Sequence, residues 1–99
     1  MITFTRTVGI NPGKQAKALA WAREVAALAK AIDGLEGHVG MPVGGNPNRI
    51  KFTTQYENLA AFEIRSAKFF SHPKYLELAA SGPERFVSGS SVDELWRDA

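Results

Sequence analysis

The spacing of apolar residues along this chain alternates between a strand period and a helical period, and that order restricts the fold most. Residues 2–10, ITFTRTVGI, place apolar side chains on one face and threonines on the other, as a β-strand does. Residues 12–33 instead space their apolar residues along one face of an α-helix: Trp21, Val25, Leu28 and Ile32. Asn11 is expected to cap this helix and Gly34 to end it.

Two further alternating segments, residues 35–43 and 49–57, follow that helix. The sequence GGNPN between them supplies the residue types that tight turns require. A phosphate-binding loop would be followed by a helix and a Lys-Ser/Thr pair, so we interpret GGNPN as a hairpin loop. Pro42 indicates that the first of these strands lies at a sheet edge, because proline cannot donate a backbone hydrogen bond.

A second helix is expected to begin at Asn58, and His72-Pro73 interrupts it before the short helical piece KYLELAA. Residues 86–96 can form a last strand. Right-handed crossovers then place both helices on one face of a four-stranded antiparallel sheet with the strand order 4-1-3-2. We therefore predict an α+β, ferredoxin-like βαββαβ fold in one domain, residues 1–99.

The composition argues against several classes of protein. The chain has no cysteine, which excludes disulfides, thiolate metal sites and a cysteine nucleophile. Its net charge is +2 and its basic residues are scattered, so nucleic acid is not an expected partner. The RNA-recognition module shares the strand order, but RIKFTTQY lacks the glycines of that module's motif. No signal-peptide pattern and no long apolar run are present, so we expect a cytoplasmic protein that does not enter a membrane.

The sheet face away from the helices is expected to be rich in threonine and poor in charge. By strand parity it carries Thr3, Thr5, Thr7, His38, Lys51, Thr53 and Gln55. A solvated sheet face usually holds more lysine and glutamate, whereas rows of threonine suit the packing of one sheet on another. We therefore expect a homodimer that forms through this open face.

The layout resembles the dimeric α/β-barrel superfamily, which includes antibiotic-biosynthesis-monooxygenase-type domains and NIPSNAP-like proteins. The resemblance rests on the βαββαβ order, on the H-P-x-Y segment at residues 72–75 and on the closing L-W-R at residues 95–97. It implies a homodimer whose sheets form a barrel, with a pocket in each subunit between sheet and helices. It does not imply one reaction, because this fold hosts monooxygenases, haem-degrading enzymes, isomerases and proteins of no known activity.

Arg6 is the most unusual residue of the first strand. It shares the parity of Phe4 and Val8, so its guanidinium is expected to point toward the helices. A guanidinium there needs acceptors, because an unpaired buried charge is costly. Either Arg6 is structural, paired with a helix acid such as Glu24 or Glu63 or extended past the sheet edge into water, or it anchors an anion or a carbonyl group in a pocket.

Thr54 and Tyr56 lie on the same face of the central strand and can line the polar end of an apolar cleft. Alternatively, Tyr56 lies at the rim of the sheet with its hydroxyl in water. Trp96 is expected to close the barrel or to reach the partner subunit. The candidate substrate-binding residues are Arg6, Trp21, Thr54, Tyr56, Phe70, His72 and Trp96.

The two histidines, His38 and His72, have no partners at metal-ligand spacing, so neither a metal site nor a bound cofactor is expected. The resemblance leaves one alternative: haem-degrading members use a helix histidine, and His72 could ligate haem in that way. Monooxygenase-type members tend to use asparagine, tryptophan and arginine around a quinol-like substrate. The first strand here offers no asparagine before Asn11.

Neither the serines nor the acidic pair near the C-terminus form a catalytic motif. Ser88, Ser90 and Ser91 lack the G-x-S-x-G pattern and are interpreted as sheet residues. Asp93 and Glu94 are adjacent in a strand and so point to opposite faces.

Two functions remain open. The first is a cofactor-independent, monooxygenase-like enzyme that acts on an aromatic or quinol-like compound. The second is a non-catalytic ligand-binding or accessory dimer for a small hydrophobic ligand. The first predicts a cavity of roughly a few hundred Å³ between sheet and helices, and it is excluded if aromatic side chains fill that space: Trp21, Phe62, Phe69 and Phe70.

Overall fold

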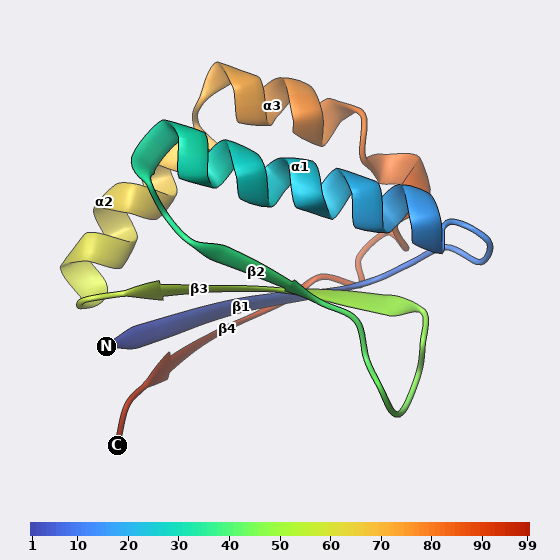
Figure 1. Cartoon of the computed structure of the whole chain (residues 1–99), viewed down its shortest axis with the longest axis horizontal. Helices are drawn as coiled ribbons and strands as arrows, with labels where there is room; N and C mark the ends of the chain where they lie inside the picture. Colours follow the sequence, from blue (N-terminus) through green and yellow to red (C-terminus); the bar gives the residue numbers. More distant parts are fainter.

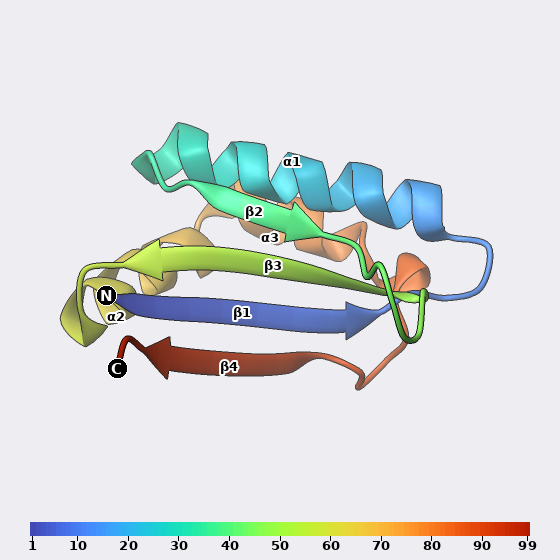
Figure 2. The same cartoon turned by 60° about the horizontal axis from the view of Figure 1, so that its bottom comes forward.

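The computed structural model describes residues 1–99 and shows one antiparallel sheet with helices on one face (Figure 1). The strands are β1 (Ile2–Gly9), β2 (Gly37–Gly40), β3 (Arg49–Tyr56) and β4 (Val92–Arg97). The helices are α1 (Gln15–Asp33), α2 (Leu59–Phe70) and α3 (Pro73–Ala80), followed by the 3-10 turn η1 (Pro83–Arg85). The strand order is β2-β3-β1-β4, which is the predicted 4-1-3-2 read from the other edge (Figure 2). The predicted α+β, ferredoxin-like fold is confirmed.

The register of β1 determines which side chains face the helices. β1 pairs antiparallel with β3 and with β4, so Arg6 lies between Phe52 on one side and Asp93 on the other. Directly paired residues point to the same face of a sheet. On the opposite face, the three threonines of β1 pair with Gln55, Thr53 and Lys51 of β3. The predicted threonine-rich face is therefore present.

The apolar core fills the space between the sheet and the helices in two clusters. One contains Phe4, Ala29, Leu35, Tyr56 and Phe69, and the other contains Ile10, Ala18, Ala22 and Ile50. Small alanine side chains let α1 approach the sheet closely, which is why those at 18 and 22 are fully buried.

The predicted signals at three element ends are confirmed. Gly34 has a left-handed φ of 65° and donates its N–H to the carbonyl of Lys30, which ends α1. The side chain of Asn58 accepts a hydrogen bond from the N–H of Ala61 and so caps α2. The GGNPN segment is a hairpin loop between β2 and β3, with a φ of 77° at Gly45.

The prediction that Asn11 caps α1 is wrong. The helix begins at Gln15, and its cap residue Lys14 makes no side-chain hydrogen bond. The side-chain amide of Asn11 instead donates to the carbonyls of Glu84 and Phe86, at 3.0 and 3.1 Å. Asn11 therefore joins the end of β1 to the segment before β4, a contact between residues far apart in the sequence.

The last strand is shorter than the predicted residues 86–96. Phe86 makes an isolated bridge to Ile10, and the chain then turns before β4 begins. Ser90 accepts a hydrogen bond from the N–H of Gly9 at 2.9 Å and donates one to the carbonyl of Val87. The serines here therefore lie in the turn and loop before β4, and their interpretation as sheet residues is wrong. The strand predicted at residues 35–43 is likewise reduced to β2.

β4 is an edge strand, and all six of its residues are exposed. The helices extend over β2, β3 and β1, and β4 lies beyond them (Figure 2). Leu95 has the parity of Phe4, yet 48% of it is exposed, and on the open face Trp96 is 61% exposed. None of the helices combines the length and apolar character needed to cross a membrane.

An ion-paired cluster joins the end of α1 to α2. Asp33 accepts a hydrogen bond from Arg65 Nε at 2.6 Å and one from Lys68 Nζ at 3.4 Å. Arg65 also donates to the backbone carbonyl of Asp33. The hydrogen bond from Arg65 lowers the pKa of Asp33 below its ordinary value of 3.8, although burial opposes this effect.

Replacing Asp33 with Asn should destabilise the fold, and the effect should depend on pH. The pKa of Asp33 is lower in the folded state, so its contribution is complete above the ordinary pKa and is lost as pH falls through the folded one. We expect urea unfolding to show a loss of about 1 kcal/mol at pH 7, and a smaller loss at pH 3. Glu36→Gln is the control, because its pair with Lys30 is largely exposed. An equal loss for Asp33→Asn at both pH values would contradict this account.

Candidate functional site

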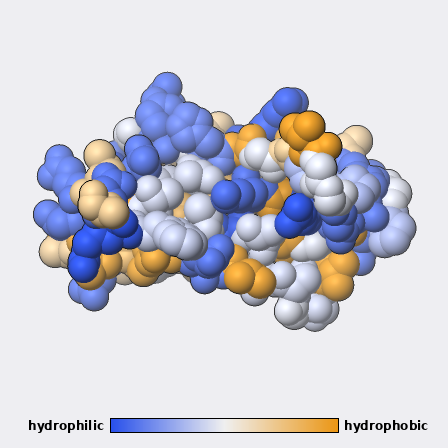
Figure 3. Space-filling view, turned by 90° about the horizontal axis from the view of Figure 1, so that it is seen from below, coloured by the Kyte–Doolittle hydropathy of each residue, from blue (hydrophilic) through white to orange (hydrophobic).

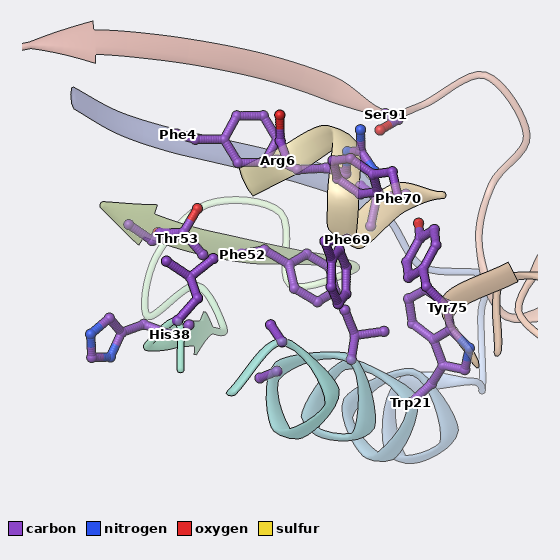
Figure 4. A pocket seen from close by; sticks show the side chains of 18 of the residues that line it. Phe4, Arg6, Trp21, His38, Phe52, Thr53, Phe69, Phe70, Tyr75 and Ser91 are labelled. Atoms are coloured by element: carbon purple, nitrogen blue, oxygen red, sulfur yellow. The ribbon is translucent and has the colours of Figure 1, made fainter. Parts of the chain in front are cut away.

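A cavity of about 170 Å³ lies between the sheet and the helices (Figure 4). Side chains of β1, β3 and α1 form much of its wall, and the end of α2 together with α3 closes it. Most of the lining is aromatic or aliphatic: Phe4, Val8, Trp21, Val25, Leu35, Phe52, Phe69, Phe70 and Phe86. The polar groups among the lining residues include Arg6, Thr54, Tyr56, Ser66, Tyr75 and Ser91. An apolar hollow with a few polar groups is the usual form of a small-molecule site.

The cavity is smaller than the predicted few hundred Å³. Aromatic side chains fill part of the space, since the ring of Phe62 packs against Phe4 and Tyr56 with centroid distances of 5.6 and 5.3 Å. Trp21 and Phe69 form walls of the cavity and do not close it. The space that the sequence predicted is therefore present in reduced form.

Five of the seven candidate residues from the sequence line this cavity, and two do not. Those around it are Arg6, Trp21, Thr54, Tyr56 and Phe70. Parity along β1 and β3 brings three of them to the helix side of the sheet, and α1 and α2 contribute the other two.

Arg6 is held by Asp93 and not by a helix acid. Its Nε and Nη2 donate to the two carboxylate oxygens of Asp93 at 2.7 and 2.8 Å. The prediction that Glu24 or Glu63 pairs with Arg6 is wrong, because the antiparallel register places Asp93 of β4 beside Arg6 of β1. The hydrogen bond to Asp93 raises the pKa of Arg6 against the effect of burial, and Tyr75 adds a smaller contribution. The guanidinium also lies over the ring of Phe70, 5.0 Å from its centroid.

Trp21 joins α1 to the C-terminal end of α3. Its indole Nε1 donates to the carbonyl of Leu78 at 2.9 Å. Its ring makes edge contacts with Phe52 and Phe86. A side chain at the buried Gly82 would begin 3.1 Å from the Trp21 ring, so glycine avoids a tight contact where the chain passes the indole.

Tyr56 is 4% exposed, so the alternative that placed its hydroxyl in water at the rim is wrong. α2 covers this end of β3 and buries the ring beneath Phe62. The hydroxyl of Thr54 donates to the Tyr56 oxygen at 3.4 Å. These two side chains therefore form one polar patch on the cavity wall.

His72 and Trp96 lie outside the cavity. The Nδ1 atom of His72 accepts the N–H of Lys74 at 3.1 Å, so this histidine caps α3. Trp96 lies on the open face of β4, opposite Thr3. A haem group does not fit this site, because the cavity is small and its one lining histidine, His38, directs its ring away from the other labelled side chains (Figure 4).

Tyr75 lines the cavity, although it was not among the predicted site residues. Its ring packs against Phe69 and Phe70 at 4.8 and 5.2 Å. The H-P-x-Y segment could have indicated this position. His72 caps α3 and Pro73 occupies the first turn of that helix, so Tyr75 lies in the same turn. No group of three or more His, Cys, Asp or Glu residues is placed to hold a metal ion.

Solved structures of low sequence identity share this fold. A NIPSNAP-family protein of unknown function from Agrobacterium tumefaciens, Atu4242, has a TM-score of 0.82 at 17% identity, covering 100% of this chain and 88% of that one. An uncharacterised NIPSNAP domain protein from Burkholderia xenovorans has a TM-score of 0.80 at 15% identity, covering 100% and 95%. A variant of SnoaB, a cofactor-independent oxygenase from Streptomyces nogalater, has a TM-score of 0.71 at 15% identity, covering 98% and 91%.

These similarities confirm the layout on which the predicted superfamily resemblance rests. Neither a protein-family model nor a curated protein matches the sequence. At such identities the likeness concerns the fold, and the function has to be argued from the cavity.

Replacing Gly82 with Ala should destabilise the protein, because the new methyl group would meet the Trp21 ring. The ring is held between Phe52 and Phe86 and has little room to move. We expect a loss of about 1–3 kcal/mol in the free energy of unfolding, measured by urea denaturation. Gly44→Ala is the matched control, because a side chain there meets nothing within 4 Å. Equal stability of the two variants would show that Trp21 does not constrain the position of this segment.

Proposed function

We propose that this protein binds a small aromatic compound in the cavity and oxygenates it without a bound cofactor. The observation that carries the binding is a mostly apolar cavity with a guanidinium and tyrosine side chains among its polar groups. Aromatic walls suit a ring, and N–H and O–H donors suit an oxygen substituent on that ring. SnoaB, described as a cofactor-independent oxygenase, has the same fold and so supports the choice of reaction.

The side chains of this cavity would bind and orient a substrate. Arg6 would donate hydrogen bonds to the oxygen substituent and would orient the ring. Trp21, Phe69 and Tyr75 would enclose the ring and keep water away from it. In oxygenation without a cofactor, the electrons that reduce dioxygen come from the substrate, which favours an electron-rich, quinol-like compound.

The second candidate is a non-catalytic ligand-binding dimer, and one observation favours it. None of the lining residues is an aspartate or a glutamate, and the ring of the lining histidine His38 points away from the other labelled side chains (Figure 4). The cavity therefore offers no evident general base. Water would then have to accept the proton of a bound phenol, or the reaction would have to proceed without removing it.

Methylhydroquinone distinguishes the two functions. If the protein is an oxygenase, the compound should raise the Tm and the protein should increase oxygen uptake above the buffer blank. A raised Tm without additional oxygen uptake would support the non-catalytic function. No change in either would contradict a ligand site in this cavity.

Replacing Ala29 with Leu should fill part of the cavity and abolish both responses, because Ala29 lines it and is buried. Ala20→Leu on the exposed side of the same helix is the matched control and should leave both responses unchanged. Retained binding by the Ala29→Leu protein would place the ligand elsewhere.

We also propose that two copies associate through the open sheet face into a barrel. That face combines threonines with exposed apolar residues of β4, and Figure 3, which views the molecule from below, mixes pale neutral and apolar residues with charged ones. Thr5 on this face is only 6% exposed even in the single chain. The threonine side chains on this face suit sheet-on-sheet packing.

Replacing Thr53 with Glu should weaken this dimer by about tenfold or more, because an unpaired charge would be buried between the sheets. Native mass spectrometry and light scattering at micromolar concentration measure the effect. Ala20→Glu adds the same charge on the exposed side of α1 and should leave the dimer intact. A monomeric wild-type protein at that concentration would contradict the proposed association.

A further inference from the structure

The ion pair beside the cavity determines what charge a ligand can carry. Arg6 is the only charged residue among those that line the cavity. Asp93 accepts hydrogen bonds from its Nε and Nη2 atoms, so the positive charge is balanced at close range. Both side chains remain partly exposed, at 31% for Arg6 and 46% for Asp93, which places the pair near the mouth of the cavity.

The pair still leaves hydrogen-bond donors free for a ligand. A guanidinium has five N–H groups. Asp93 uses two of them, and the Tyr75 side chain also lies beside the group, so N–H groups remain for a ligand. Phe70 lies against one face of the group and holds its plane. Arg6 therefore offers a fixed donor in a locally neutral environment.

A neutral ligand gains from this arrangement and an anion does not. A carboxylate that approached Arg6 would also meet the carboxylate of Asp93, and it would lose its hydration on entering an apolar cavity. An amide carbonyl or a phenol oxygen accepts from an N–H of Arg6 without the same cost. A repulsive group beside an attractive one is a common way to achieve such discrimination.

The volume of the cavity suits a ligand of one ring. Apolar cavities of about 150 Å³ hold a molecule of benzene, and this one measures about 170 Å³. The walls formed by Trp21 and Tyr75 are held in place by the Trp21–Leu78 hydrogen bond and by packing on Phe69. A compound of three fused rings would require these walls to separate.

We propose that Asp93 is a specificity-determining residue that makes the cavity select a neutral, single-ring aromatic compound with an oxygen acceptor directed at Arg6. This inference rests on the proposed function, since it concerns the same cavity. It adds the charge and the size of the ligand, and it assigns the selection to a residue that does not itself line the site.

Benzamide and benzoate test the inference, because they have nearly the same shape and differ in charge. Calorimetric titration of the wild-type protein at pH 7 should give an affinity for benzamide about tenfold or more above that for benzoate, since like charges disfavour the anion. In Asp93→Asn benzoate should gain about tenfold, so that most or all of the preference for benzamide is lost, because Arg6 is then uncompensated. Asp98→Asn, the same substitution beyond the end of β4, should keep the wild-type order. Anthrone, with three fused rings, should bind none of these proteins.

Circular dichroism establishes whether each variant is folded before it is titrated. An unchanged ratio in folded Asp93→Asn would overturn the role of Asp93 while leaving ligand binding intact. Equal wild-type affinities for benzamide and benzoate would overturn it as well, and this measurement does not depend on the variant. Binding of anthrone would overturn the limit on size. Absence of binding by every compound, methylhydroquinone included, would overturn the proposed function and this inference together.

Discussion

Antiparallel pairing of β1 with both of its neighbours is the constraint on which the rest of the structure depends. The register sets Phe4 and Arg6 on the helix side and the threonines on the other side. A shift of one residue would exchange these faces, because side chains alternate along a strand. It would place Arg6 on the open face and threonine under α1. The core, the cavity and the open face therefore share one cause.

The cavity lies where large side chains replace small ones between the sheet and the helices. Alanines on α1 let one half of that helix lie directly on the sheet, where Ile10 and Ile50 are fully buried. In the other cluster, aromatic side chains pack between the layers, and several of them line the cavity. Trp21 then joins α1 to α3 through the carbonyl of Leu78, so the wall of the cavity is tied to the helix that supports it.

Local signals predicted those parts of the fold that depend on neighbouring residues. Strand and helix periods gave the element order, and Gly34 and Asn58 act at their helix ends as their residue types suggest. Asn11 shows where such reasoning fails: its amide can cap a helix or bind distant carbonyls, and in the folded chain the carbonyls of Glu84 and Phe86 lie within reach. The shortened last strand has a similar cause, because Ser90 bonds to Gly9 from the opposite end of the sequence.

The sequence by itself determined the order of strands and helices, the parity that directs Arg6 toward the helices, and the threonine-rich face, since these follow from residue spacing. Only the tertiary structure decided that Asp93 is the partner of Arg6, that Tyr56 is buried and that Tyr75 lines the cavity. Each of these depends on distances between elements far apart in the chain. The cavity volume was decided in the same way, because it is the difference between the space that the backbone encloses and the side chains that fill it.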